Sequence, residues 1–283
     1  MTEHPLGIFA GGGALPGQVA QAALAQGRDV FLLGFEGFAD PQVLAPYPHA
    51  FVRLGAAGRM RELLNAHACH DLVMAGAVRR PSMLNIRPDA FGLKVLGRIG
   101  RAAFAGDDTI LSAIVKVLNE EGFVVRGVDE VLSEALAPAG LLTRAAPDDA
   151  ARADMARGIA VVRALGSVDV GQCAVVQQGI VLAVEAAEGT DQMLLRAGRL
   201  SRPGPGGILV KLVKPGQDRR VDLPTIGPET VRLAARAGLR GIAFEAAGTL
   251  IIERAATVAA ADAAGLFLLG VDPAIVARGA DRA

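Results

Sequence analysis

The stretch LGIFAGGGALPGQVAQAALA, residues 6–25, decides how this chain begins to fold. Its apolar start, Leu6–Ala10, predicts a buried strand, and residues from about 16 to 26 predict a helix. Three glycines, Gly11, Gly12 and Gly13, join the two elements. A glycine turn before a helix N-terminus lets a phosphate approach free backbone N–H groups. The same residues are typical of a plain tight turn, and both interpretations stay open.

The spacing of these glycines bears on a third interpretation, a dinucleotide site. The spacing Gly11-x-Gly13-x-x-x-Gly17 is one residue longer than the dinucleotide fingerprint, and Pro16 removes one N–H donor. Glu36 follows the second expected strand, about where an acid that binds a ribose would stand. A nicotinamide-dependent oxidoreductase is therefore an alternative that the glycine spacing disfavours.

Short apolar runs alternate with amphipathic segments through the first half of the chain. The expected strands are Leu6–Ala10, Val30–Leu33, Phe51–Leu54, Leu72–Ala75 and Phe123–Val125, and the expected helices span about 16–26, 58–67, 89–104 and 108–121. Nearly continuous apolar strands separated by helices predict a parallel sheet with helices on both faces. We therefore expect an α/β protein whose N-terminal domain, residues 1–134, is Rossmann-like.

The second half has a different pattern and predicts a second domain. Residues 135–147 contain two prolines and many small residues, which predicts a linker before a C-terminal α/β domain at 148–283. The expected strands are Gln172–Gln177, Ile180–Glu185, Gly207–Lys214, Gly241–Glu245 and Thr249–Glu253, and the expected helices span 147–165, 190–200, 228–237 and 256–264. Gln177-Gln178-Gly179 between two strands predicts a tight hairpin, so we expect a mixed sheet.

The composition excludes several classes of protein. Lys plus Arg and Asp plus Glu both number 29 among 283 residues, and this balance argues against a nucleic-acid binder. Cys69 and Cys173 lie in apolar runs and are interpreted as buried, reduced thiols. We expect a cytoplasmic protein, because the sequence shows no secretory signal and no continuous apolar run of membrane-spanning length.

Carboxylates follow an apolar strand in the stretch VEAAEGTDQMLLRAGRL, residues 184–200. Glu185, Glu188 and Asp191 fall within seven residues of one another. Strand ends carry the active sites of α/β domains, and carboxylate oxygens suit Mg²⁺. The alternative is a set of surface ion pairs together with a helix cap supplied by Thr190 or Asp191.

A second charged stretch, GGILVKLVKPGQDRRVDLPTIG, covers residues 206–227. Lys211 and Lys214 end an apolar strand, and Asp218, Arg220 and Asp222 alternate, so they share one face if the segment is extended. Cations in such a place would neutralise the charge of a phosphoryl group during its transfer.

Two shorter motifs belong to the first half. Arg79 and Arg80 follow the expected strand that ends at Ala75, and Asp107 and Asp108 open the helix expected at 108–121. The two acids favour the helix N-terminus through its dipole, or they face a cleft; both interpretations stay open.

These motifs together resemble a known family. GIFAGGGALP, GAVRRP, GDDTIL, VLAVEAAEGTD, GGILVKLVKPGQDRRVDLPTIG and GIAFEAAGTLII occur in this order from about Gly7 to Gly270. The chain resembles the bacterial UDP-2,3-diacylglucosamine pyrophosphatases of the two-domain kind, which lack the metallophosphoesterase signature. The four histidines of this chain form no such signature either.

The resemblance implies a reaction in lipid A synthesis. Water attacks the α-phosphorus of UDP-2,3-diacylglucosamine and gives UMP and 2,3-diacylglucosamine 1-phosphate (lipid X), with Mg²⁺ or Mn²⁺ required. The substrate lies between a Rossmann-like domain and a C-terminal α/β domain. A protein that binds a nucleotide sugar or a lipid without catalysis, and the oxidoreductase named above, are the alternatives.

We expect the following residues to form the site. The catalytic candidates are Asp222, Asp218, Lys211, Lys214 and Arg220, and the metal candidates are Glu185, Glu188, Asp191 and Asp222. The substrate-binding candidates are Gly11, Gly12, Gly13, Ala14, Leu15, Arg79, Arg80, Asp107, Asp108, Thr190, Gln217 and Thr225.

The substrate carries two acyl chains, which raises the question of membrane contact. In the expected helix 89–104, Lys94, Arg98 and Arg101 lie on one face beside apolar residues such as Phe91 and Phe104. A helix of this kind can lie on the cytoplasmic face of the inner membrane, but it can equally cover a sheet with a solvated basic edge. Peripheral contact and a homodimer both stay open.

Overall fold

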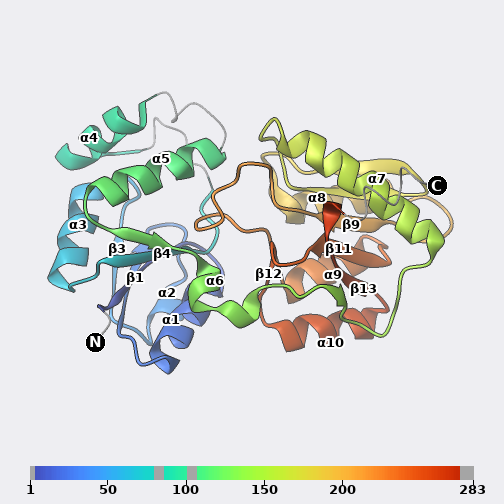
Figure 1. Ribbon diagram of the computed structural model, residues 1–283, viewed down its shortest axis with the longest axis horizontal. Helices are drawn as coiled ribbons and strands as arrows, with labels where there is room; N and C mark the ends of the chain where they lie inside the picture. Colours follow the sequence, from blue (N-terminus) through green and yellow to red (C-terminus); the bar gives the residue numbers. More distant parts are fainter. Residues whose placement is uncertain (1–3, 80–85, 101–106, 275–283) are drawn as a thin grey trace. The chain divides into compact units, whose positions relative to one another are not determined.

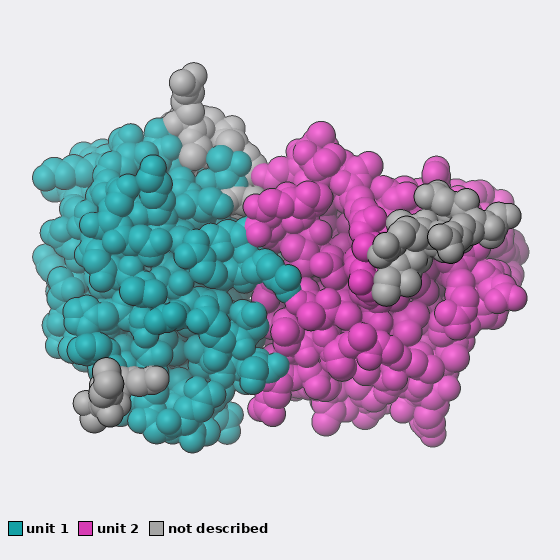
Figure 2. All heavy atoms as spheres, in the orientation of Figure 1, with its two compact units in different colours: residues 1–133, 218–222 teal, residues 134–217, 223–283 magenta. Residues whose placement is uncertain are grey.

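The computed structural model describes residues 4–79, 86–100 and 107–274 of the chain (Figure 1). The chain folds into two compact units, shown in different colours in Figure 2. The first unit comprises Met1–Ser133 together with Asp218–Asp222, and the second comprises Glu134–Gln217 together with Leu223–Ala283.

A five-stranded parallel sheet forms the centre of the first unit, as the sequence predicts. The strand order is β3-β2-β1-β4-β5. The strands are β1 (Leu6–Ala10), β2 (Val30–Phe35), β3 (His49–Val52), β4 (Asp71–Ala75) and β5 (Val124–Arg126). The strand order changes direction between β1 and β4, which is the place where doubly wound sheets bind ligands.

Helices cover both faces of this sheet. They are α1 (Leu15–Ala25), α2 (Pro41–Leu44), α3 (Ala57–Ala66), α4 (Ala90–Ile99), α5 (Asp107–Glu120) and α6 (Val128–Val131). Phe9 and Phe31 point to the face where Met60 and Leu64 of α3 pack. In Figure 1, α1 and α2 lie below the sheet and α5 lies above it. The Rossmann-like arrangement expected from the alternating pattern is therefore confirmed.

The second unit contains a mixed six-stranded sheet with the order β6-β13-β11-β9-β7-β8. The strands are β6 (Gly140–Leu141), β7 (Cys173–Gln177), β8 (Ile180–Val184), β9 (Ile208–Lys211), β11 (Gly241–Glu245) and β13 (Phe267–Val271). The three strands β9, β11 and β13 run parallel, and the others pair antiparallel to their neighbours. A separate two-stranded sheet pairs β10 (Thr225–Ile226) with β12 (Leu250–Ile251).

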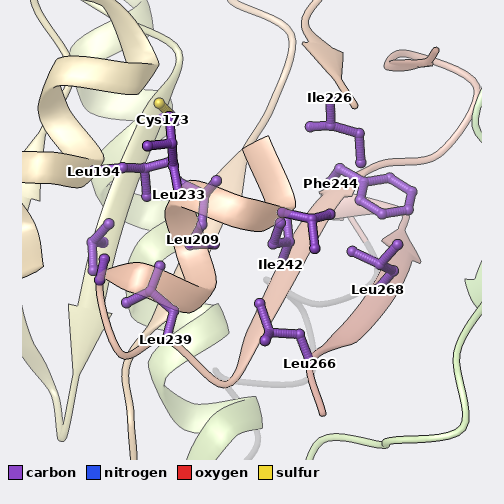
Figure 3. Close-up of a cluster of buried hydrophobic side chains, with 14 of the residues drawn as sticks. Cys173, Leu194, Leu209, Ile226, Leu233, Leu239, Ile242, Phe244, Leu266 and Leu268 are labelled. Atoms are coloured by element: carbon purple, nitrogen blue, oxygen red, sulfur yellow. The ribbon is translucent and has the colours of Figure 1, made fainter. Parts of the chain in front are cut away.

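Alternating side chains divide the core of the second unit between the two faces of its sheet. Leu209 and Cys173 point to the face covered by α8 (Gly189–Gly198), α9 (Pro228–Arg236) and α10 (Arg254–Ala264), and Figure 3 shows this cluster. Ile208 and Val210 point to the other face, where α7 (Asp149–Gly166) packs. This alternation fixes the face on which each polar side chain at the strand ends lies.

The hairpin predicted at Gln177-Gln178-Gly179 is present. Gln178 and Gly179 have φ angles of 54° and 75°, as a two-residue turn with both central residues in the left-handed region requires. The carboxylate of Asp154 on α7 accepts the N–H groups of Gln178 at 3.0 Å and Gly179 at 2.6 Å, so the turn is bound to the helix.

Three segments differ from the sequence-based expectations. The expected linker 135–147 lies within the second unit, where β6 pairs with β13. A two-residue strand has too short a pattern to be read from sequence. The strand Phe267–Val271 was not expected, although its run is apolar, and the strand expected at 207–214 ends at Lys211.

The helix expected at 89–104 is also shorter, since α4 ends at Ile99. Arg98, which we expected in an exposed basic stripe, hydrogen-bonds to Glu120 and to Glu121, the latter at 2.6 Å. Residues 101–106 lie outside the described part, so the remainder of that stripe is not placed. Among the described residues, no helix is both long and apolar enough to cross a membrane.

Candidate active site

The glycine turn lies at the point in the first unit where the strand order reverses. Gly11 N–H donates to the carbonyl oxygen of Ala75 at 2.8 Å, at the end of β4. Gly12 and Ala77 exchange two backbone hydrogen bonds, of 2.8 and 3.1 Å. The loops that follow β1 and β4 are thus joined backbone to backbone.

The close approach of these loops explains the glycine at position 11. A Cβ atom on Gly11 would lie 2.6 Å from the carbonyl oxygen of Gly76 and 2.7 Å from that of Ala77. A Cβ on Gly76, whose φ is +89°, would meet Gly12 O at 2.6 Å. Gly13 differs, because its φ of +86° favours glycine but no atom of the described residues lies within 4 Å of the place that a Cβ would take. Gly11 is therefore needed for packing, and Gly13 is the glycine with open space beside it.

The remaining substrate-binding candidates of the first unit are Ala14, Leu15, Arg79, Arg80, Asp107 and Asp108. Ala14 is the N-cap residue of α1 in a helical conformation, and Leu15 begins the helix, with Pro16 in its first turn. Arg79 is exposed, whereas Arg80 and the side chains of Asp107 and Asp108 lie outside the described residues.

The second unit gathers polar groups at one edge of its sheet. The parallel strands β9 and β11 end there, at Lys211 and Glu245. Because β7 runs antiparallel to β9, its first residue, Cys173, is the Cα partner of Lys211. Glu185 follows the end of β8, and its N–H donates to Cys173 O at 2.9 Å. Strand direction therefore places residues distant in sequence at the same edge.

A buried hydrogen-bond network links four of the predicted residues. The Thr190 hydroxyl donates to Glu185 Oε1 at 2.7 Å and accepts from Lys211 Nζ at 3.0 Å. Lys211 Nζ also donates to the carbonyl oxygen of Thr225 at 3.0 Å, and Glu185 Oε2 accepts from Gln172 N–H at 3.0 Å. Glu185 is 7% exposed and Lys211 is 5% exposed. The network thus compensates two buried, opposite charges through one hydroxyl group.

The donors of this network and the start of α8 favour an anion. An ammonium group carries three N–H donors, and Lys211 uses two of them on acceptors within the described residues. Thr190 lies in the first turn of α8, where the helix dipole also favours an anion. Burial raises the pKa of the nearby Cys173 thiol, the charge of Glu185 adds to this effect, and the thiol is therefore not an activated nucleophile.

Lys214 and Gln217 form a separate group. Lys214 Nζ donates to Asp169 Oδ1 at 2.7 Å. The side-chain carbonyl of Gln217 accepts the N–H of Lys214 at 2.9 Å, and Gln217 N–H donates to Lys214 O at 3.2 Å. Gln217, which we expected to bind substrate, therefore uses its carbonyl oxygen to close a turn.

The segment Asp218–Asp222 carries the other charged candidates and groups with the first unit. Arg220 donates to both carboxylate oxygens of Asp218, at 2.9 and 2.6 Å. These hydrogen bonds lower the pKa of Asp218 and raise that of Arg220. The N–H of Asp222 donates to Asp218 O at 3.2 Å, and Asp222 itself is half-buried.

Two of the four carboxylates expected to hold a metal, Glu185 and Glu188, have other partners. Glu185 accepts from Thr190 and from Gln172 N–H, and Glu188 forms an ion pair with Arg196. A hydrogen bond to its own backbone, and then Arg196, lower the pKa of Glu188. Asp191 is an exposed residue of the first turn of α8. Within the described part of the chain, no three His, Cys, Asp or Glu residues are arranged to hold a metal ion.

The expected metal ligands therefore do not fit a resident ion. The cap expected from Thr190 or Asp191 also differs, because the N-cap residue of α8 is Glu188 and no side chain caps the helix. The hydroxyl of Thr190 points instead to Glu185 and Lys211.

Two carboxylates at this end of the second unit were not among the sequence candidates. Glu245, at the end of β11, accepts the N–H of Val213 at 3.1 Å. Its position as the last residue of the apolar run Gly241–Glu245 was a usable signal. Asp169 lies in the loop after α7, and nothing in its sequence context marks it as the partner of Lys214, 45 residues away.

Comparison with known proteins supports one family. The model of the LpxI N-terminal domain matches residues 5–135, and the model of the LpxI C-terminal domain matches residues 138–269. A UDP-2,3-diacylglucosamine pyrophosphatase LpxI of Caulobacter vibrioides is 45% identical over 274 residues, which cover 95% of this chain and 98% of that protein.

A comparison of structures adds little. The crystal structure of the Bordetella bronchiseptica enzyme WbmG in complex with NAD and UDP is 16% identical to this chain, with a TM-score of 0.26. The match covers 44% of this chain and 36% of the other, and so slight a likeness carries no argument. The two domain matches and the 45% identity over nearly the full length of the chain show that this chain belongs to the LpxI family.

Proposed function

We propose that this chain hydrolyses UDP-2,3-diacylglucosamine to UMP and 2,3-diacylglucosamine 1-phosphate, a step of lipid A biosynthesis. The observation that carries the proposal is the 45% identity, over 98% of its length, to a protein named for this activity. Such coverage includes both domains, so the likeness is not confined to a shared nucleotide-binding fold.

The polar edge of the second unit supports this chemistry. A diphosphate carries negative charge that must be compensated when water attacks the α-phosphorus. Lys211 can direct its remaining N–H donor at a phosphoryl oxygen, while Thr190 and Thr225 hold the ammonium group in place. A buried ammonium interacts more strongly with a phosphate than an exposed one, because water screens it less.

Asp222 is our candidate for the general base. In this role its carboxylate accepts a proton from the attacking water, and the bond from the α-phosphorus to the bridging oxygen breaks. The electron pair of that bond leaves with 2,3-diacylglucosamine 1-phosphate, a stable phosphate monoester that needs no protonation to depart. Asp218 takes no part in this step, because both of its carboxylate oxygens accept hydrogen bonds from Arg220.

We also propose that the reaction uses Mg²⁺ or Mn²⁺. The carboxylates of the described residues do not form a resident site for such an ion. Mg²⁺ is commonly held by one or two carboxylates together with the phosphate oxygens of a substrate. We therefore expect little binding of Mg²⁺ by the protein alone.

The direct test is incubation of the purified protein with UDP-2,3-diacylglucosamine and Mg²⁺ in ¹⁸O-water. Formation of UMP that carries the label is the expected result. Label in the lipid phosphate would contradict attack at the α-phosphorus. Tight binding without any product would favour a non-catalytic binding protein.

Contact with a membrane surface is a further part of the proposal. On α4, Leu93 is 61% exposed and Lys94 is exposed beside it, whereas Arg98 is held by Glu120 and Glu121. We expect sedimentation with anionic liposomes to depend on Leu93 and Lys94 and to decrease with salt. Unchanged sedimentation of a Leu93→Ser/Lys94→Ala variant would exclude α4 as the contact.

A further inference from the structure

The ion pair between the buried Lys214 and the half-buried Asp169 is separate from the network of Thr190 and Lys211. The side chain of Lys214 is 9% exposed and that of Asp169 is 25% exposed. Their atoms Nζ and Oδ1 are 2.7 Å apart, while Oδ2 of Asp169 is buried and has no hydrogen-bond partner among the described residues. Removing two charges from water costs free energy that packed apolar side chains in the same place would not cost. The presence of this pair therefore calls for an explanation.

The backbone around Asp169 is specialised for this pairing. Its φ of +53° lies in the left-handed region, which Asp and Asn tolerate better than most residues. Its N–H donates to Gly166 O at 3.1 Å, so the residue is fixed to the last turn of α7. Asp169 therefore presents its carboxylate from a rigid helix end.

The turn that contains Lys214 is held from two further directions. Gln217 closes it through hydrogen bonds in both directions with the backbone of Lys214. A Cβ on Gly166 would lie 2.9 Å from Pro215 Cδ and 3.4 Å from Lys214 Cα, so the helix end packs directly on the turn. The turn 214–217 is thus closed by its own hydrogen bonds, and it is held to the end of α7 by packing on Gly166 and by the ion pair with Asp169 in the loop that follows.

The turn 214–217 directly precedes the charged segment Asp218–Asp222. The residue after Gln217 is Asp218, the first residue of the segment that groups with the other unit, and this segment ends at Asp222. We propose that Asp169 is a positioning residue, which acts through Lys214 to fix the point from which Asp218–Asp222 starts and so the placement of the Asp222 carboxylate. This proposal rests on the proposed function, in which Asp222 acts on the attacking water.

Two substitutions separate charge from backbone geometry. Asp169→Asn keeps the side-chain shape and tolerates the left-handed conformation but removes the charge. Asp169→Gly suits φ of +53° and removes the side chain entirely. Asp262→Asn is the matched control. The side chain of Asp262 is 20% exposed and forms an ion pair with Arg144 in the same unit. Asp262 lies near the C-terminal end of α10, shortly before β13.

We expect kcat to fall about tenfold in Asp169→Asn and more in Asp169→Gly, with KM within about twofold of wild type, because a displacement of about 1 Å can cost up to a hundredfold in rate. Asp262→Asn is expected to keep both constants. Thermal melts followed by circular dichroism measure the folded fraction of each variant. A fall in kcat that only matches the folded fraction would show a merely structural pair and overturn the proposal.

Hydrogen exchange supplies a readout that does not need activity. The N–H groups of Val221 and Asp222 donate to Asp218 O, so their exchange reports on the order of this segment. We expect faster exchange across 215–222 in both Asp169 variants and no change in Asp262→Asn. Unchanged exchange would overturn the proposal, whether or not the wild-type protein hydrolyses the substrate. If the wild type were inactive but exchange were faster in the variants, the proposed function would be refuted. The role of Asp169 in fixing the start of the segment Asp218–Asp222 would still hold.

Discussion

Substitution of the glycines that follow β1 separates packing from ligand binding. In Gly11→Ala the new Cβ would lie 2.6 Å from Gly76 O, whereas ordinary contact begins at 3.4 Å. Neither backbone can yield without parting the loops after β1 and β4, which would lengthen the two hydrogen bonds between Gly12 and Ala77. Overpacking costs about 1–3 kcal/mol and each lost hydrogen bond about 1 kcal/mol. We therefore expect a loss of about 3 kcal/mol.

Gly13→Ala is the matched control on the same turn. Within the described part of the chain no atom lies within 4 Å of the new Cβ, so we expect a cost of about 1 kcal/mol from φ of +86° alone. For a unit of this size, 1 kcal/mol corresponds to about 2–4 °C in Tm, which predicts shifts of about 6–12 °C and 2–4 °C for the two variants. The chain contains no Trp, so circular dichroism is the suitable probe of unfolding.

The two variants also test whether a phosphate of the substrate binds at the glycine turn. A phosphate that approaches Gly13 would meet the new Cβ, and KM of Gly13→Ala would rise several-fold with a nearly normal Tm. An unchanged KM would favour a plain turn. If Gly11→Ala proved as stable as Gly13→Ala, the contact between the two loops would not be the reason for glycine at position 11, and the reasoning would be refuted.

Three further predictions concern the charged residues. Asp222→Ala is expected to lower kcat at least about a hundredfold, as is typical of lost acid–base chemistry, and a folded variant with near-normal kcat would reject the assignment. The Asp218–Arg220 hydrogen bonds lower the pKa of Asp218 below its unfolded value, so their stabilisation is present above pH of about 4 and is lost as the pH falls through the folded pKa. Urea denaturation of Asp218→Asn should then show a deficit of less than about 1 kcal/mol at pH 7 that shrinks below pH 4, and a deficit that grows in acid would contradict this sign. Glu188→Gln should leave the Mg²⁺ concentration for half-maximal activity unchanged, because Glu188 pairs with Arg196, and a clear increase would restore Glu188 as a metal ligand.

The lysines at the end of β9 illustrate what strand patterns can and cannot specify. The sequence marks Lys211 and Lys214 equally, as cations after an apolar run. The structure separates them, because Lys211 binds Thr190 and Thr225 whereas Lys214 binds Asp169. Their partners lie 14 to 45 residues away in sequence, and no local pattern records such distances.

The acidic motif after β8 shows the same limit. Glu185, Glu188 and Asp191 predict a metal cluster because they are close in sequence and suited to Mg²⁺. In the fold, Glu185 is buried against Thr190, while Glu188 pairs with Arg196 of α8. Residues that are close in sequence need not bring their carboxylates to one site, because the turn between a strand and a helix directs neighbouring side chains apart.

The sequence alone determined the elements and their class in this protein. Apolar runs alternating with helical periodicity were sufficient for the parallel sheet of the first unit and for most strands of the second, because burial of one face imposes a local repeat. Only the tertiary structure decided that Gly11 serves the contact with Gly76, that β6 continues the second sheet and that Asp169 binds Lys214. Each of these depends on two segments that meet only after folding, and the physical constraint acts on the pair rather than on either stretch of sequence.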